Sequence, residues 1–528
     1  MKTQSRSYRT TAGAAVLLVL VAALALVSAC GGNGSDSQGG STAQIATYAY
    51  LYEPVTNWDP ALEYQSVGTL LNVYETLTRW NAAEQKADPL LATEWSSAKG
   101  GMTWTFKIRE GVTFHDGTEL DAAAVKSSIE RTIKMGVTAF VWAPVDTIKT
   151  PDKYTVVFNL KFPAAMDTVA SAAYGAFIYS PTAVSENGDK WFGDGNEAGT
   201  GPYMLQKWTL GKEAVLTKYA GYWGGWDGKH LDKVVIKTVP ETALRRQLLE
   251  SGEADVANDL PPQDLQALAG SDAVDVVTSP SFKNFNVGFV ETSKPLDDVL
   301  VRRALTYAFP YTDVVEFAAG GNASQARGPV PAGVPGHDDQ LPQLSLDLDK
   351  ARQLLADAGV ADGFSLVAMY ASGDELSRKA LELYKEKLQE IGVTLDIRSA
   401  PFQSLFEQSK QEKPPFQVLA GYWWPTYVTA YDWLWNLYSS QSIGVYNMVK
   451  YSNPDFDALI DQAFAAEATD RQKADELYGQ AQQILSDDAV GVFALDTDDV
   501  TVVSTSLKGY EFNPAYQFTV FFYECYKE

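Results

Sequence analysis

Cysteine and histidine are scarce in this chain. Its 528 residues include two cysteines, Cys30 and Cys525, and three histidines, His115, His230 and His337. The histidines lie far apart, and none has a second ligand at the spacing of a structural metal site. The sequence therefore predicts neither a disulfide-stapled scaffold nor a metal centre, and it implies no cofactor.

Basic residues are also in short supply. Lys and Arg number 42 against 66 Asp and Glu, so the formal net charge is −24. Residues 1–29 contain three basic residues, Lys2, Arg6 and Arg9, and no acidic residue. If this segment is removed, the net charge of the remaining chain becomes −27. Such a surface repels polyanions, which excludes nucleic acid as a partner.

Long apolar runs are absent except for one near the start. Residues 14–27 follow a basic segment and precede the small pair Ser28-Ala29, which is typical of an export signal. The run is shorter than the roughly 20 residues of a membrane-spanning helix. Val27-Ser28-Ala29-Cys30 resembles the lipobox of bacterial lipoproteins, which implies lipidation of Cys30 and an anchor on the outer face of the cell membrane. An uncleaved anchor helix and an ordinary signal peptide remain alternatives.

The rest of the chain predicts an α/β protein of about three domains. Residues 30–42 are rich in Gly, Ser and Asn and read as a flexible tether. Trp104, Phe106 and Ile108 alternate as in a half-buried strand. Asp121 is placed to cap a helix over 122–133, and later helices are expected after Asp297-Asp298, after Asp347, over 377–390 and from Asn453-Pro454. Helices followed by Gly and then by a strand favour βα units in a parallel or mixed sheet.

Five sequence blocks, in a fixed order, resemble the extracellular solute-binding proteins of the peptide/nickel ABC importer family. The blocks are LATEW (91–95) with TWTFKIREGVTFHDG (103–117), GTGPY (199–203), LLESGEAD (248–255), NFNVG (284–288) with VRRAL (301–305), and KARQLL (350–355). His115 within the first block is interpreted as a turn residue with a local hydrogen bond, because no nucleophile accompanies it.

This resemblance implies a two-lobed, periplasmic-binding-protein-like fold with a small extra domain inserted in the first lobe. Lobe one is expected to combine residues 43–80, 190–285 and 490–528, the extra domain to cover 81–189, and lobe two to cover 286–489. The family also implies a monomer that delivers a solute to membrane permease subunits without catalysis.

The resemblance places the ligand site in the aromatic stretch 421–435. Related proteins carry a Trp followed, after a short gap, by Asp-Tyr-Pro-Asp-Pro, and in peptide-binding members the first Asp pairs with the α-ammonium group of the ligand. Thr426 occupies that position here, with Asp432 farther along as a possible substitute. The predicted ligand-binding residues are Tyr422, Trp423, Trp424, Thr426, Tyr427, Asp432 and Trp433, with Trp58 and Asn284; Tyr174 and Trp142 are weaker candidates.

The chemistry of the ligand stays open at this point. Oligopeptides and oligosaccharides both suit a cleft rich in Trp and Tyr. Two other functions compete with solute capture. One is a secreted carbohydrate-active enzyme, which needs two carboxylates about 5–10 Å apart in one cleft. The other is a signalling or adhesion lipoprotein on the same scaffold.

Overall fold

The computed structural model describes residues 44–528, and the predicted signal segment, Cys30 and the tether lie outside this range. One large mixed sheet runs through these residues in the order β15-β14-β16-β12-β17-β11-β1-β10-β9-β8, and β13 also pairs with β17. Its strands are β1 (Ile45–Tyr50), β8 (Tyr203–Thr209), β9 (Glu213–Lys218), β10 (Lys233–Thr238), β11 (Val256–Asn258), β12 (Val274–Phe289), β13 (Ala323–Gln325), β14 (Phe364–Ala371), β15 (Val393–Ala400), β16 (Val418–Trp423) and β17 (Gly491–Ser504).

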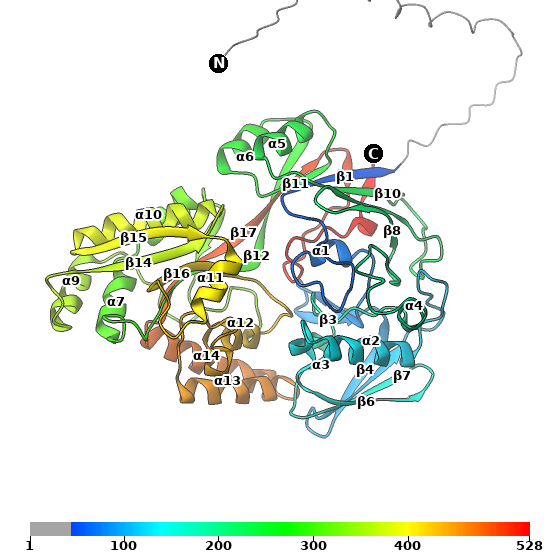
Figure 1. Ribbon diagram of the computed structural model, residues 1–528, viewed down its shortest axis with the longest axis horizontal. Coiled ribbons are helices and arrows are strands. Elements are labelled where there is room, and N and C mark those ends of the chain that lie inside the picture. Colours follow the sequence, from blue (N-terminus) through cyan, green and yellow to red (C-terminus); the bar gives the residue numbers. More distant parts are fainter. Residues whose placement is uncertain (1–43) are drawn as a thin grey trace, which may run out of the picture. The chain divides into compact units, whose positions relative to one another are not determined.

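Two long strands of this sheet belong to both lobes. The first part of β12, residues 274–280, pairs with the end of β17, which also pairs with β11 in lobe one. The second part, residues 284–289, pairs with β16 in lobe two and with the start of β17. The β12–β17 register shifts between Pro280 and Asn284, and such irregularities bend a strand locally. Figure 1 shows β12 and β17 passing from one lobe to the other.

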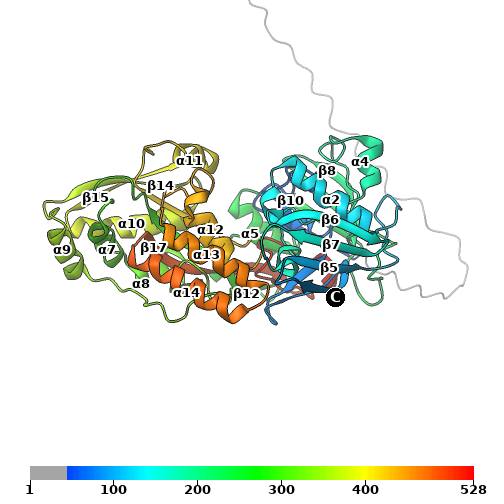
Figure 2. The same cartoon turned by 90° about the horizontal axis from the view of Figure 1, so that it is seen from below.

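A separate four-stranded antiparallel sheet forms the centre of the predicted extra domain. Its order is β4-β5-β7-β6, with β4 (Ala92–Ala98), β5 (Thr103–Ile108), β6 (Val145–Asp152) and β7 (Thr155–Leu160). The alternation predicted for β5 is confirmed, since Trp104, Phe106 and Ile108 are all buried. Helix α2 (Ala122–Met135) packs beside β6 and β7 (Figure 2). Its N-cap is Asp121, as predicted, and accepts a hydrogen bond from the Ala124 amide at 2.8 Å.

Lobe two carries most of the predicted later helices. Asp298, Asp347 and Asn453 cap α7 (Val299–Tyr307), α9 (Leu348–Asp357) and α13 (Pro454–Glu467), as the sequence indicates. Helix α10 (Glu375–Glu390) begins two residues before the predicted start, because Asp374 rather than a later residue is its N-cap. Two further helices, α12 (Ala430–Tyr438) and α14 (Arg471–Asp487), lie next to α13. Among residues 44–528, no helix has the length and apolar character needed to span a membrane.

The interpretation of His115 as a residue with only local bonds is wrong. Its Nδ1 lies 2.6 Å from Glu197 Oε2, and its Nε2 lies 2.8 Å from the Gly201 carbonyl oxygen. The Gly201 carbonyl oxygen can only accept, so Nε2 carries a proton, and Glu197, which also accepts from the Gly199 amide, accepts from Nδ1 when the ring is charged. Burial lowers the pKa of His115, but Glu197 and the Gly201 carbonyl outweigh that effect and raise it. The charged imidazolium thus ties the first sequence block to the second and serves the scaffold.

Candidate ligand site

The aromatic segment at the end of β16 bridges the two lobes. Trp424 Nε1 donates a hydrogen bond to the Tyr174 hydroxyl at 2.9 Å, and its ring meets Phe518 edge to face with centroids 5.7 Å apart. The Ala173 amide donates to the Thr426 carbonyl oxygen at 2.9 Å. Tyr174 follows the small sheet of the extra domain, and Phe518 lies in the C-terminal segment. Residues 424–426 thus contact both the extra domain and the C-terminal segment, beside a buried core in which α12, α13 and α14 pack against lobe one.

Asp432 places a carboxylate behind Thr426. It accepts hydrogen bonds from the Thr426 amide at 2.9 Å, from Trp423 Nε1 at 3.1 Å and from Asn436 Nδ2 at 3.0 Å. Its side chain reaches the loop from the first turn of α12, which is capped by Thr429. The residue is 1% exposed, and burial raises the pKa of its carboxyl to about 7. A shift of the loop is thus unnecessary for Asp432 to approach the position of Thr426.

Several residues predicted for the ligand site are buried in this structure. Trp433 and Trp58 are both 0% exposed and belong to one hydrophobic core cluster. Tyr427 packs into the core of the small sheet, and Trp142 is buried there with Nε1 bonded to the Gly175 carbonyl oxygen. Asn284 is buried and donates from Nδ2 to the Pro329 carbonyl oxygen at 2.6 Å. We therefore centre the candidate site on the half-buried rings of Tyr422, Trp423 and Trp424, with the buried Thr426 and Asp432 positioning the segment behind them.

Phe518 is the main residue that sequence reasoning missed. Its φ is 65°, a backbone conformation that is uncommon for a residue other than glycine and is often found where function constrains the chain. Its ring meets Tyr52, which is 51% exposed, with centroids 6.3 Å apart. No local sequence signal marks such a conformation at a phenylalanine.

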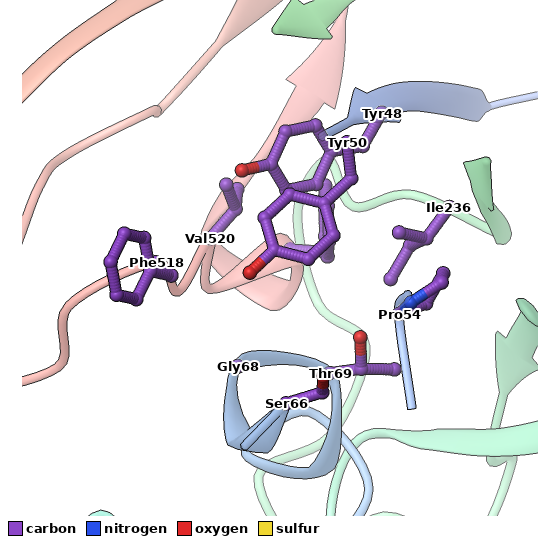
Figure 3. A pocket seen from close by; sticks show the side chains of 10 residues that line it. Tyr48, Tyr50, Pro54, Ser66, Gly68, Thr69, Ile236, Phe518 and Val520 are labelled. Atoms are coloured by element: carbon purple, nitrogen blue, oxygen red, sulfur yellow. The ribbon is translucent and has the colours of Figure 1, made fainter. Parts of the chain in front are cut away.

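A small pocket in lobe one lies beside Phe518. Its volume is about 260 Å³ including its open mouth, and it is lined by Tyr48, Tyr50, Pro54, Ser66, Gly68, Thr69, Ile236, Phe518, Val520 and Phe522 (Figure 3). A Cβ atom at Gly68 would lie 2.5 Å from the Phe518 carbonyl oxygen. Gly68 is thus needed for the close approach of the Phe518 backbone, which holds the ring at the lobe interface.

The buried carboxyl of Asp432 predicts a pH-dependent stability. Its pKa is about 7 in the folded chain and about 3.9 when unfolded, so between these values the folded state alone keeps the proton. The free energy of unfolding should therefore fall as the pH rises from about 4 to about 7, by on the order of 2–4 kcal/mol from this group. Urea unfolding of wild type and Asp432→Asn at both ends of this range measures the effect. Equal pH dependence in the two proteins would contradict it.

Comparison with known proteins finds a family and a fold. Residues 86–444 match the family model described as bacterial extracellular solute-binding proteins, family 5 Middle. The probable D,D-dipeptide-binding periplasmic protein DdpA of Escherichia coli (strain K12) is 29% identical over 87% of this chain and 88% of its own length. The glutathione-binding protein GsiB of Pectobacterium atrosepticum is 29% identical over 82% of this chain and 84% of its own.

Two solved structures share the two-lobed fold. The periplasmic binding protein DppA from Helicobacter pylori, in complex with the peptide STSA, gives a TM-score of 0.79 at 23% identity and covers 92% of this chain and 98% of its own. The dipeptide-binding protein from Pseudoalteromonas sp. SM9913, in complex with Met-Leu, gives 0.81 at 20% identity and covers 92% and 100%. The predicted fold class, a mixed α/β protein with two lobes, is confirmed.

Proposed function

We propose that this chain, which belongs to the bacterial extracellular solute-binding proteins of family 5, captures a small peptide-like solute between its lobes and delivers it to the permease of an ABC importer. The protein would act as a monomer, held on the outer face of the cell membrane by a lipid on Cys30. The tether 30–42 would let the body reorient between capture and delivery. No covalent step is needed for this role.

The observation that carries the proposal is the aromatic contact between the lobes. Trp424 of lobe two meets Tyr174 of the extra domain and Phe518 of lobe one, while β12 and β17 join the lobes through a strand pair with a shifted register. A solute bound against these rings would touch both lobes at once. Its binding energy would then favour the conformation in which the lobes touch, by hinge closure.

The peptide-like class of the proposed solute is supported by the related proteins. DdpA and GsiB are named for D,D-dipeptides and glutathione, and both solved structures contain peptides. Asp432 positions the neighbouring residues of the aromatic segment, because its carboxyl accepts hydrogen bonds from the Thr426 amide and from Trp423 Nε1. These observations favour a short peptide-like solute over an oligosaccharide.

A thermal-shift screen of the purified protein tests this function. The compounds are Met-Leu, D-Ala-D-Ala, glutathione, a tetrapeptide, maltotriose and nickel. A bound solute at 100 times its Kd stabilises the folded state by about 2.7 kcal/mol, so a peptide-like compound should raise the melting temperature clearly. Stabilisation by maltotriose alone would contradict the peptide class, and its conversion to product would favour the carbohydrate-active enzyme.

The lipid anchor makes a separate prediction about the two cysteines. Cys30→Ser should release the protein from the membrane fraction, because no other lipidation site is predicted. Cys525→Ser is the matched control, since Cys525 is buried and burial raises the pKa of its thiol to about 12. Fractionation followed by mass spectrometry of the N-terminal peptide measures the outcome. Membrane retention of Cys30→Ser without lipid would indicate an uncleaved anchor helix instead.

A further inference from the structure

Lys283 occupies an unusual position on the strand that joins the lobes. It lies in β12, between Pro280 and Asn284, where the register against β17 shifts. Its backbone is fixed on both sides, because its amide donates to Ser281 Oγ at 3.0 Å and its carbonyl accepts from Thr497 Oγ1 at 2.9 Å. A bulge can re-aim a side chain, and here the lysine leaves the strand at the junction of the lobes.

The ammonium group of Lys283 lies between aromatic rings from both lobes. Nζ is 4.9 Å from the ring centroid of Tyr422 in lobe two and 5.7 Å from that of Phe518 in lobe one. Within residues 44–528 this ammonium makes no ion pair and no hydrogen bond. Rings offer a cation partial compensation only, so a half-buried ammonium here still favours a negatively charged partner.

Acidic residues from three segments lie around this part of β12, and one of them, Asp259, also has a basic neighbour, because Arg245 Nη2 donates to its carbonyl oxygen at 2.9 Å. Asp499 on β17 is bonded to Thr501 Oγ1 at 2.7 Å, and burial raises the pKa of its carboxyl to about 6, an effect that Asp259 reinforces and Lys283 opposes. Asp259, which is exposed and has a φ of 53°, makes no ion pair among the described residues. Asp374 also lies near Tyr422, and accepts a hydrogen bond from its hydroxyl at 3.0 Å.

An ammonium with acidic residues in its neighbourhood can select for both charges in a ligand. A purely anionic solute would be attracted by Lys283 and repelled by Asp259 and Asp499, whereas a zwitterion can satisfy both sets of charges. We propose that Lys283 receives the carboxylate of a zwitterionic solute, whose cationic group faces Asp259 and Asp499. This inference rests on the proposed capture of a solute between the lobes, and it makes Lys283 a specificity-determining residue.

Acid and amide forms of one peptide test this role. Met-Leu and D-Ala-D-Ala, each with a free carboxylate or a C-terminal amide, are titrated by calorimetry into wild type, Lys283→Met, Lys283→Arg and Lys410→Met. Lys410 is the matched control, because its ammonium also lies over a ring, 4.1 Å from the centroid of Phe406, but pairs with Glu407. We expect wild type, Lys283→Arg and Lys410→Met to bind the acid about 10- to 100-fold more tightly than the amide. Lys283→Met should bind both forms equally.

Two results would overturn the role of Lys283. One is equal affinity of wild type for acid and amide, and the other is an equal loss of both affinities in Lys283→Met, which would indicate a purely structural clamp. A second pair, trigalacturonic acid and its methyl ester, separates this inference from the peptide proposal. If only the sugar acid binds, with loss in Lys283→Met, the peptide class fails and so does the pairing of a cationic group with Asp259 and Asp499, while the role of Lys283 as a carboxylate receptor stands. No preference for the acid in either pair contradicts it.

Discussion

Trp424→Ala is expected to lower the affinity for the solute by about 30- to 150-fold, corresponding to about 2–3 kcal/mol. Trp424 contributes one of the two indole rings of the candidate site, and it contacts the Tyr174 hydroxyl of the extra domain and the Phe518 ring of lobe one. Its removal takes away a flat surface for the ligand. It also removes a contact that stabilises the conformation in which the lobes touch. Calorimetric titration with the solute found in the screen measures the loss.

The control for Trp424 separates ring contact from the hydrogen bond. Tyr174→Phe removes the hydroxyl that accepts from Trp424 and keeps the ring, so its affinity should fall by less than about tenfold. The melting temperature of unliganded Trp424→Ala should stay near that of wild type, because the side chain is only half-buried. Unchanged affinity in Trp424→Ala would place the solute elsewhere.

Trp433→Ala should instead destabilise the fold by about 3–5 kcal/mol. Trp433 lies on α12, only nine residues after Trp424 in the same aromatic stretch, yet its side chain is completely buried in the core. The substitution leaves a large cavity among apolar neighbours. Urea unfolding measures the loss, and Trp433→Phe should recover much of it, because Nε1 of Trp433 has no hydrogen-bond partner within residues 44–528. A stable Trp433→Ala protein with weak solute binding would place this ring in the site.

Much of the scaffold follows from local sequence signals. Asp121, Asp298 and Asp347 were each predictable as helix caps, because a short acidic side chain before an amphipathic run has one favoured use. The strand β5 was equally clear from its alternation. The start of α10 was predicted two residues late, although Asp374 is its N-cap and Glu375 lies in its first turn.

The candidate site depends on contacts that local sequence does not encode. Trp424 lies at the lobe interface, whereas Trp433 lies in the core. This difference depends on where β16 ends and α12 begins, and on where the other lobe packs against them. Phe518 and Lys283 lie more than 200 residues apart in sequence, and only the return of β17 alongside β12 brings them together. A pairing of this kind requires the tertiary fold.

The most direct test of solute capture between the lobes is a crystal structure of the protein with the solute that the screen identifies. The account predicts electron density for the solute between the lobes, in contact with Trp424 and Phe518 and with its carboxylate at Lys283. Solute density on the outer surface of either lobe, with the rings of Trp424 and Phe518 still in contact only with each other, would contradict it.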